Sequence, residues 1–431
     1  MYRTLLLPFV CAPIFAAAPD PTFYKDVLPL LQDRCQECHR PGEIGKMPLL
    51  TYQQTRPWAA AIKQSVALHK MPPWFADPHY GKFANDRSLT PEQIATLTTW
   101  VDKGAKEGSP KDAPAPRKFG NGWNIPTPDL VLQMEKPFPI PATGTIDYHY
   151  VVLPTRFTED HWVQMSETRP TDRSVVHHMV IFVRGPESKW LRGEAEPGVP
   201  FLPPKGPGRN DIGGGGNEIL TVYTPGMVPD VLKPNQARLI KAGSDLVLQI
   251  HYTTNGKATQ DQTKIGLVFS KQPPTERVMS VPLNNPRFAI PPGDPNYEVS
   301  MKGRPINSAK LVSLFPHMHL RGKDFEYRLV YPTGEKQTLL RVPKYDFNWQ
   351  LAYKPAEDIA IPAGSYFECT AHFDNSPNNP YNPDPKAEVR FGEQSWEEMM
   401  IGFYDIVIPA DMSLNDLFRQ KKPETPTGSN N

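Results

Sequence analysis

The spacing of apolar residues divides the chain into a helical part and a strand-rich part. Over residues 23–108 the apolar positions recur with helical periodicity. Thr90 is a good N-cap and Pro91 suits the first helical position, so a helix begins there. We expect helices over 24–31, 56–69 and 91–104.

From Pro126 onward, short segments of alternating apolar and polar residues replace the helical pattern, and Pro, Gly and Asn turns separate them. This pattern is typical of antiparallel β-sandwiches. We therefore expect a small all-α domain followed by two mainly antiparallel β-sandwich domains. The expected divisions are a signal peptide over 1–18, the helical domain over 19–108, a linker over 109–125, β domains over 126–275 and 276–411, and a flexible tail over 412–431.

The first 18 residues predict export. Arg3 supplies a positive start, residues 5–15 an apolar run, and Ala16–Ala18 a small-residue cleavage zone. Cys11 would suit a lipoprotein, but the residues before it are not the small ones that such a signal requires. The run is too short to span a bilayer well, so we expect a periplasmic or secreted protein that is not integral to the membrane.

Composition narrows the function further. The 431 residues carry a net charge of +1, so nothing attracts the chain to nucleic acid. Cys11 leaves with the signal and Cys369 stands alone, so no disulfide is expected. The glycine-rich segment 203–216 lacks the Lys-Ser/Thr ending of a phosphate-binding loop.

A haem-attachment motif follows the first predicted helix. Cys35, Cys38 and His39 have the C-x-x-C-H spacing, which allows two thioethers to haem and one imidazole to iron. A disulfide or half of a zinc site is the alternative, but no second cysteine pair completes a zinc site.

Haem iron also takes a sixth ligand, often methionine. Met71 is the first candidate, because adjacent prolines hold the backbone beside it extended. Met47 is the second candidate and His69 the third. The order helix, C-x-x-C-H, helix, Met, helix resembles a small class I c-type cytochrome over residues 19–108, which implies covalent haem c.

Histidines cluster in three apolar, strand-like runs of the second part. His317 and His319 would lie on one face of a strand, as half of a metal site. His177 and His178 are adjacent and would point apart in a regular strand, so we expect a bulge or strong twist if both bind one metal. His251 lies in a third run. Imidazole suits zinc, copper, iron or nickel, so histidine alone does not name the metal.

These histidines, followed by Glu397-Glu398-Met399-Met400, resemble the copper type II, ascorbate-dependent monooxygenases over about residues 126–408. That family includes peptidylglycine α-hydroxylating monooxygenase and dopamine β-monooxygenase. The resemblance implies two jelly-roll-like β-sandwiches with one copper on each, facing across a cleft. It assigns an electron-storing copper to His177, His178 and His251, and an oxygen-binding copper to His317, His319 and Met399.

The chain departs from this family at the substrate pocket. Where peptide-amidating members place Arg, Asn and Tyr, this chain has Phe315, Ile401 and Phe403, which favours an apolar substrate. Met400 stands where the family has a cysteine, so the resemblance leaves Cys369 without its disulfide partner.

The expected function is hydroxylation of a C–H bond of a small apolar molecule with O₂. Electrons would come from an ascorbate-like reductant or a redox protein, with the fused haem as a further route. The alternative is a periplasmic haem/copper electron-transfer or copper-binding protein without oxygenase activity. A zinc hydrolase is disfavoured because no His-Glu-x-x-His sequence is present. His372 remains a candidate extra ligand or a hydrogen-bond partner of a ligand, whereas His79, His149 and His161 carry no spacing pattern.

Overall fold

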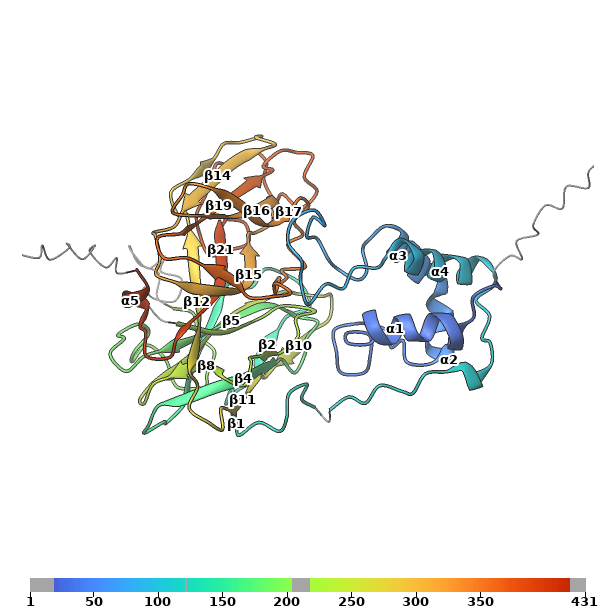
Figure 1. Cartoon of the computed structure of the whole chain (residues 1–431), viewed down its shortest axis with the longest axis horizontal. Helices are drawn as coiled ribbons and strands as arrows, with labels where there is room; N and C mark the ends of the chain where they lie inside the picture. The colour runs from blue at the N-terminus through green and yellow to red at the C-terminus, as the bar shows by residue number, and fades with distance from the viewer. Residues whose placement is uncertain (1–18, 121, 204–217, 419–431) are drawn as a thin grey trace, which may run out of the picture. The chain divides into compact units, whose positions relative to one another are not determined.

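The computed structural model describes residues 19–120, 122–203 and 218–418. The expected signal peptide, residues 204–216 of the glycine-rich segment and the tail from 419 lie outside these ranges. The chain is mainly β, with 34% strand and 12% helix. It forms two compact units, which Figure 1 shows as ribbons. Within the described ranges, unit 1 comprises residues 19–72 and 88–117, and unit 2 comprises 73–87 and 118–418.

Unit 1 contains the predicted helices. Thr90 caps the last one with a capping box, since its side chain accepts from the Gln93 N–H and the Gln93 side chain accepts from the Thr90 N–H. Phe23 and Trp100 are fully buried in the core of this unit. The helices are η1 (Phe23–Val27), α1 (Leu28–Arg34), α2 (Tyr52–Thr55), η2 (Arg56–Trp58), α3 (Ala59–Ala67), α4 (Pro91–Asp102) and η3 (Pro110–Asp112).

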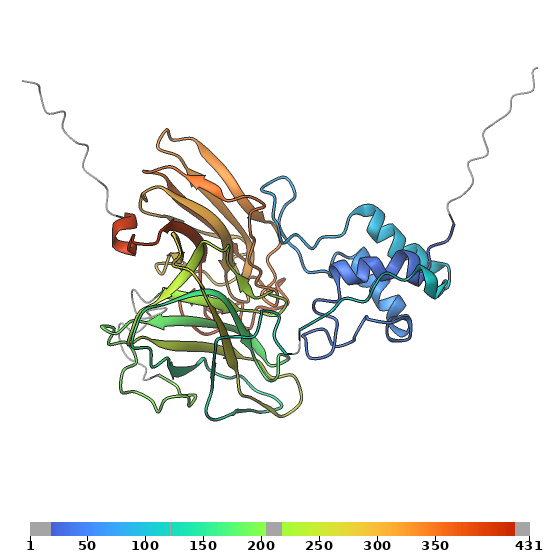
Figure 2. The same ribbon diagram turned by 60° about the horizontal axis from the view of Figure 1, so that its bottom comes forward.

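Unit 2 is built from layered sheets (Figures 1 and 2). One sheet has nine strands, with β7 pairing β4 and the others in the order β1-β11-β4-β8-β12-β21-β15-β18. Their bounds are β1 (Leu130–Gln133), β4 (His161–Arg169), β7 (Asp230–Val231), β8 (Gln236–Ile240), β11 (Lys264–Phe269), β12 (Glu276–Asn284), β15 (Ala309–His317), β18 (Ile359–Ile361) and β21 (Ile401–Pro409).

Two four-stranded sheets accompany the long sheet, in the orders β3-β9-β5-β6 and β14-β19-β16-β17. The first contains β3 (His149–Pro154), β5 (Val176–Arg184), β6 (Glu218–Tyr223) and β9 (Asp245–Tyr252), and the second contains β14 (Tyr297–Lys302), β16 (Gly322–Val330), β17 (Lys336–Val342) and β19 (Tyr366–Phe373). The remaining elements are the pair β2 (Phe138–Ile140) and β10 (Thr259–Asp261), the pair β13 (Ala289–Ile290) and β20 (Val389–Arg390), and α5 (Leu414–Phe418).

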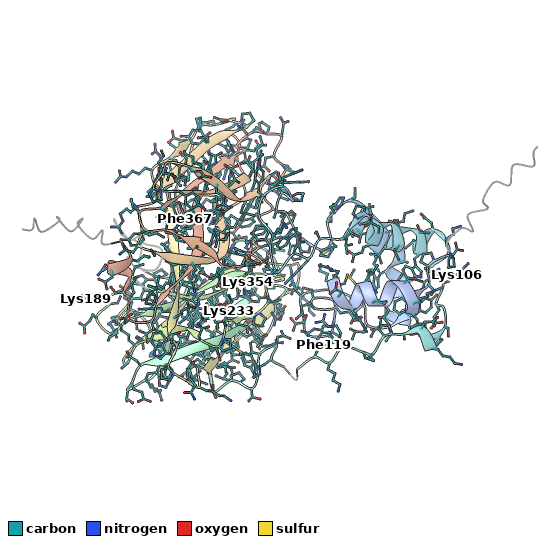
Figure 3. All side chains as sticks on the ribbon, in the orientation of Figure 1. Lys106, Phe119, Lys189, Lys233, Lys354 and Phe367 are labelled. Atoms are coloured by element: carbon teal, nitrogen blue, oxygen red, sulfur yellow. The ribbon has the colours of Figure 1, made fainter. Side chains whose placement is uncertain are left out.

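Each four-stranded sheet shares an apolar core with part of the long sheet, as alternating strands predict. Side chains fill this space throughout unit 2, among them Phe367 (Figure 3). Phe367 is 1% exposed and stacks on Tyr404, with ring centroids 4.1 Å apart. The mainly antiparallel β architecture expected from the sequence is confirmed at this level.

The two β halves are not separate sheets. β12 pairs in parallel with β8, Glu276 opposite Gln236 and Arg277 opposite Ala237, which joins the halves into one sheet. Buried Arg238 reinforces the junction by an ion pair of 2.9 Å to Asp405. The predicted boundary at 275/276 therefore falls inside a continuous sheet.

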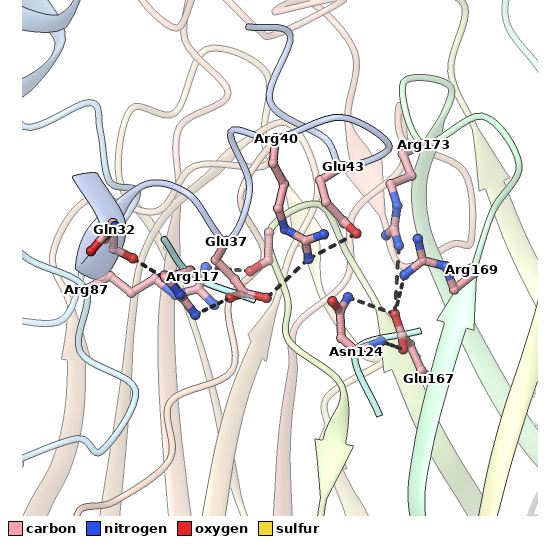
Figure 4. Close-up of polar contacts among 11 residues, drawn as sticks. Gln32, Glu37, Arg40, Glu43, Arg87, Arg117, Asn124, Glu167, Arg169 and Arg173 are labelled. Atoms are coloured by element: carbon pink, nitrogen blue, oxygen red, sulfur yellow. Dashed lines mark hydrogen bonds and ion pairs between the residues drawn. The ribbon is translucent and has the colours of Figure 1, made fainter. Parts of the chain in front are cut away.

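Three expected boundaries differ from the structure. Residues 73–87, which we assigned to the helical domain, pack in unit 2. The linker 109–125 is tied at both ends (Figure 4), because Arg117 donates to the Gln32 carbonyl at 2.6 Å and the Asn124 N–H donates to Glu167 at 2.6 Å. The expected flexible tail begins with α5, whose Leu417 is fully buried.

Within the described ranges, no helix is both long and apolar enough to cross a bilayer.

Candidate metal centre

Two strands of one sheet bring the first three histidines together. His177 and His178 lie on β5, and His251 lies opposite His178 on β9. The ladder shifts register between Val176 and His178. This irregularity agrees with the bulge or strong twist that we expect if both histidines bind one metal, and it allows two adjacent imidazoles to reach the same place.

The nitrogens of these three histidines suit one metal ion. Nδ1 of His177 lies 3.0 Å from Nδ1 of His178, and one ligand atom from each of the three lies within 4.8 Å of the others. Two nitrogens bound to one ion at about 2.0–2.1 Å lie about 3 Å apart. Nδ1 of His251 is buried without a hydrogen-bond partner among the described residues. A buried imidazole nitrogen of this kind can bind a metal ion.

Two further side chains orient these rings. The Tyr148 hydroxyl lies 3.2 Å from Nε2 of His178, and its ring stacks on His251 with centroids 4.6 Å apart. Ser395 contributes its hydroxyl 3.1 Å from Nε2 of His251. Such hydrogen bonds fix the tautomer and orientation of a metal-binding imidazole.

The second set lies where β15 ends. Nδ1 of His317 donates to Oε1 of Gln350 at 2.7 Å, and Nδ1 of His319 lies 3.2 Å from the Glu397 carbonyl. Both rings therefore keep Nε2 for another partner. Nε2 of His319 is buried and has no hydrogen-bond partner in the described part of the chain. Burial raises the pKa of nearby Glu398 to about 8, and its carboxyl oxygen accepts from the His319 backbone N–H.

The two sets form a single buried cluster. The ring centroids of His178 and His317 are 5.4 Å apart. Phe347 stacks on His177 at 4.1 Å and lies 6.1 Å from His319, so one aromatic ring touches both sets. The resemblance implied two sites facing across a cleft, whereas here the cleft is closed by ring contacts.

Burial keeps these imidazoles neutral. Desolvation, together with the charge of His317, lowers the pKa of His177 to about 4, and desolvation lowers the pKa of His317 to about 4. At neutral pH each ring therefore has one nitrogen with a free lone pair, and this neutral form is the one in which histidine binds metals.

An apolar cavity touches both sets. His178, His317 and Met399 line it, together with Phe315, Ile401 and Phe403, the three positions predicted to make the pocket apolar. Its volume of about 20 Å³ holds about one water. A neighbouring cavity of about 50 Å³ shares Phe315 and Phe403 and adds the charged groups Asp230, Arg238, Lys354 and Asp405.

The haem motif follows α1 in unit 1. Cys35 and Cys38 do not form a disulfide. Nδ1 of His39 lies 3.1 Å from the Met47 carbonyl, which leaves Nε2 available to iron. Gly45 is packed so closely that a Cβ there would lie 2.7 Å from Nδ1 of His39. Two unlinked thiols and an imidazole held at Nδ1 fit covalent haem attachment.

The three candidates for the sixth ligand of the haem iron, Met71, Met47 and His69, lie in different surroundings in unit 1. The carbonyl of Met47 sits at the Nδ1 edge of His39, away from the Nε2 that would bind iron, which disfavours Met47. Met71 is half-buried in the turn after α3, where its N–H donates to the Ser65 carbonyl at 3.3 Å. His69 has a positive φ of 52° in the same turn. Met71 as the iron ligand stays a prediction.

His372 is not part of the cluster, which corrects its candidacy as a ligand. It lies on β19, where its Nδ1 is 2.7 Å from the Asp324 carboxylate and its Nε2 is 3.6 Å from the Glu298 carboxylate.

Cys369 is buried directly beneath Gly402, where a Cβ added to the glycine would lie 2.5 Å from the cysteine sulfur. The sequence had no pattern that singled out Tyr148, Phe347 or Gln350, because each reaches the cluster through tertiary contacts.

Comparisons with known proteins add no function. No family model and no curated protein matches the chain. Similar solved structures include the infectious bursal disease virus VP2 subviral particle, with 9% identity, a TM-score of 0.19, and coverage of 67% of this chain and 73% of that one. The structure of the infectious bursal disease virus Gx strain has 8% identity and a TM-score of 0.18, over 67% and 74%. Scores this low carry no argument about fold or activity.

Proposed function

We propose that this protein is an exported, copper-dependent monooxygenase that hydroxylates a C–H bond of a small apolar substrate with O₂. The observation that carries the proposal is one buried cluster of five histidines beside an apolar cavity that Met399 also lines. Imidazole-rich sites of this kind suit copper, and a thioether favours Cu(I). Covalent haem c on Cys35, Cys38 and His39 would accompany the two coppers.

The proposed ligand sets follow the two halves of the cluster. His177, His178 and His251 would hold one copper, and His317, His319 and Met399 the other. Copper, when bound, supplies the one-electron steps and the activation of O₂. The chain's own contribution begins with Gln350, which holds the His317 ring with Nε2 free, and with Phe347, which excludes water between the sets.

The cavity indicates how a substrate would be oriented. Phe315, Ile401 and Phe403 would bind its apolar part and direct a C–H bond toward His317 and Met399. The charged groups of the neighbouring cavity would receive a polar end, if the substrate has one. Because the apolar cavity holds only about one water, Phe315 or Phe403 must move before a substrate fits.

The same small volume favours a second candidate, an exported haem/copper electron-transfer or copper-binding protein without oxygenase activity. In that protein the closed cluster would only exchange electrons. Its only partners would then be a reductant and an electron acceptor. The oxygenase, in contrast, would also consume O₂ and a small organic substrate.

Metal and haem content, followed by oxygen uptake, tests the proposal. The protein would be exported during expression, loaded with copper, and analysed by elemental analysis and a pyridine haemochrome. Two coppers and one haem per chain, with ascorbate-driven oxygen uptake that yields a hydroxylated product from apolar test compounds, would support it. Copper loading without product from any of these compounds would favour the electron-transfer candidate, and absence of copper would exclude both.

A further inference from the structure

Residues 73–87, here called the strap, leave unit 1 just after Met71 and bind along unit 2. The strap then returns the chain to unit 1 at Ser88, ahead of α4. Ordered hydrogen bonds along its length distinguish it from a flexible linker. They join Asp77 N to Arg341 O at 2.8 Å, Ala356 N to Lys82 O at 2.8 Å, Ala84 N to Lys354 O at 2.8 Å, Asn85 Nδ2 to Ala352 O at 2.8 Å and Arg87 Nη1 to Gly226 O at 2.6 Å.

Aromatic rings anchor the start of the strap. The Trp74 ring lies 5.0 Å from that of Tyr353 and 5.9 Å from that of Phe83. Tyr353 is only 1% exposed. Trp74 is therefore packed on a buried ring of unit 2, with aromatic contact on two sides.

Tyr353 belongs to the segment that touches the histidine cluster. It exchanges two backbone hydrogen bonds with Leu314, at 2.8 and 2.9 Å, and Leu314 lies three residues before His317 on β15. Three residues before Tyr353, Gln350 accepts from His317 Nδ1 at 2.7 Å. A short series of contacts thus connects Trp74 to a predicted metal ligand.

Chain geometry limits the remaining distance to the haem side. Met71 precedes Trp74 by three residues, and an extended chain advances at most about 3.6 Å per residue. The Cα atoms of these two residues therefore lie no more than about 11 Å apart, however the two units are arranged. The residue predicted to bind iron cannot move away from the anchored end of the strap.

We propose that the strap is the electron path from the haem to the histidine cluster, through Trp74, Tyr353 and Gln350. This inference rests on the proposed function, because it requires both haem and copper. With haem and copper bound, each transfer would oxidise one ferrous haem to ferric and reduce one cupric ion to cuprous. No bond forms or breaks and no proton moves. Two such transfers supply one hydroxylation.

Lengthening the strap where it leaves unit 1 tests the path. A Gly-Ser-Gly-Ser-Gly-Ser insertion between Pro72 and Pro73 separates Met71 from Trp74, and the same insertion between Arg87 and Ser88 leaves that span intact. Haem of the copper-loaded, oxygen-free protein is photoreduced, and its reoxidation is followed by absorbance. We expect a rate independent of protein concentration in the unmodified protein, a loss on the order of tenfold in the first variant and little change in the second.

A point variant tests the same path without an insertion. Trp74→Leu removes the ring while the backbone bonds of the strap remain, and Trp396→Leu is the matched change at a tryptophan that is 43% exposed. We expect slower haem reoxidation in Trp74→Leu alone. Equal rates in these two variants, an unchanged rate in the variant lengthened at Pro72, or no haem reoxidation in the unmodified protein would overturn the path.

Failure of the path and failure of the proposed function are distinguishable. Copper content and ascorbate-driven oxygen uptake are measured on the same preparations, and neither depends on haem as the donor. Normal values of both with unchanged haem reoxidation in the lengthened variant would reject the strap alone. Absence of copper from the unmodified protein would reject the function on which the strap depends.

Discussion

Gln350 offers a sharp test of the candidate copper site, because its side chain touches a predicted ligand without being one. It is 1% exposed, and its Oε1 accepts from His317 Nδ1 at 2.7 Å. Gln350→Leu keeps a side chain of similar size but removes the acceptor. The backbone carbonyl of residue 350 can still accept from Thr224, so the local loop keeps its anchor.

The expected loss follows from that one hydrogen bond. Removing an outer partner of a metal-binding histidine typically weakens metal binding about 10–100-fold. This corresponds to about 1.4–2.8 kcal/mol, at 1.4 kcal/mol for each factor of ten. The copper-free protein should also lose about 1–3 kcal/mol of stability, because His317 Nδ1 is left buried without a partner.

Gln249→Leu is the matched control. Gln249 is 5% exposed and lines the same apolar cavity, but its amide donates to the Tyr150 hydroxyl and not to a histidine. Copper affinity would be measured by competition with a coloured Cu(I) chelator, and stability by urea unfolding of the copper-free proteins. Gln350→Glu, which retains an acceptor, should recover most of the affinity. Equal copper affinity in Gln350→Leu and Gln249→Leu would refute the assigned role of Gln350.

Three further predictions concern separate parts of the chain. His251→Ala should lower copper from two ions to one per chain by elemental analysis, while His372→Ala should keep both; equal copper contents would contradict the ligand assignment. Met71→Ala should abolish the thioether–iron absorption band of the ferric protein, whereas Met47→Ala should retain it; the reverse result would exchange their roles. Burial alone would raise the pKa of Asp230, but neighbouring cationic groups lower this pKa overall. Its charged form therefore stabilises the fold above about pH 4, the pKa of an unfolded Asp. This stabilisation is lost as the pH falls through the lower pKa of the folded state. Asp230→Asn should therefore cost about 3 kcal/mol at pH 7 and progressively less in acid, as measured by urea unfolding at several pH values; a pH-independent cost would contradict this account.

Local patterns in the sequence were sufficient for several elements. The capping box at Thr90 and Gln93 acts within one helical turn, so its residues predict the start of α4. The bulge at His177 and His178 followed from the two-residue period of a strand, because adjacent side chains of a regular strand point apart. The apolar lining at Phe315 followed from the resemblance, and the structure places that residue beside the cluster.

Contacts between distant segments could not be predicted in this way. Phe347 and Gln350 lie in a loop with no motif, and they matter because that loop packs on His177 and His317. The strap has the composition of an ordinary connection, and only its hydrogen bonds to residues about 270 positions away reveal that it belongs to unit 2. The contacts between the two sets of histidines also depend on how the two β halves pack together. No local pattern in the sequence predicts that packing.

The parallel pairing of β8 with β12 has a consequence for anyone who divides the gene. A fragment that ends at residue 275 would retain β8 but lose the strand that covers its edge, and the complementary fragment would expose β12. Uncovered strand edges recruit other chains, so both pieces are expected to aggregate when expressed alone. A recombinant β region should therefore contain both halves, with boundaries that lie outside the nine-stranded sheet.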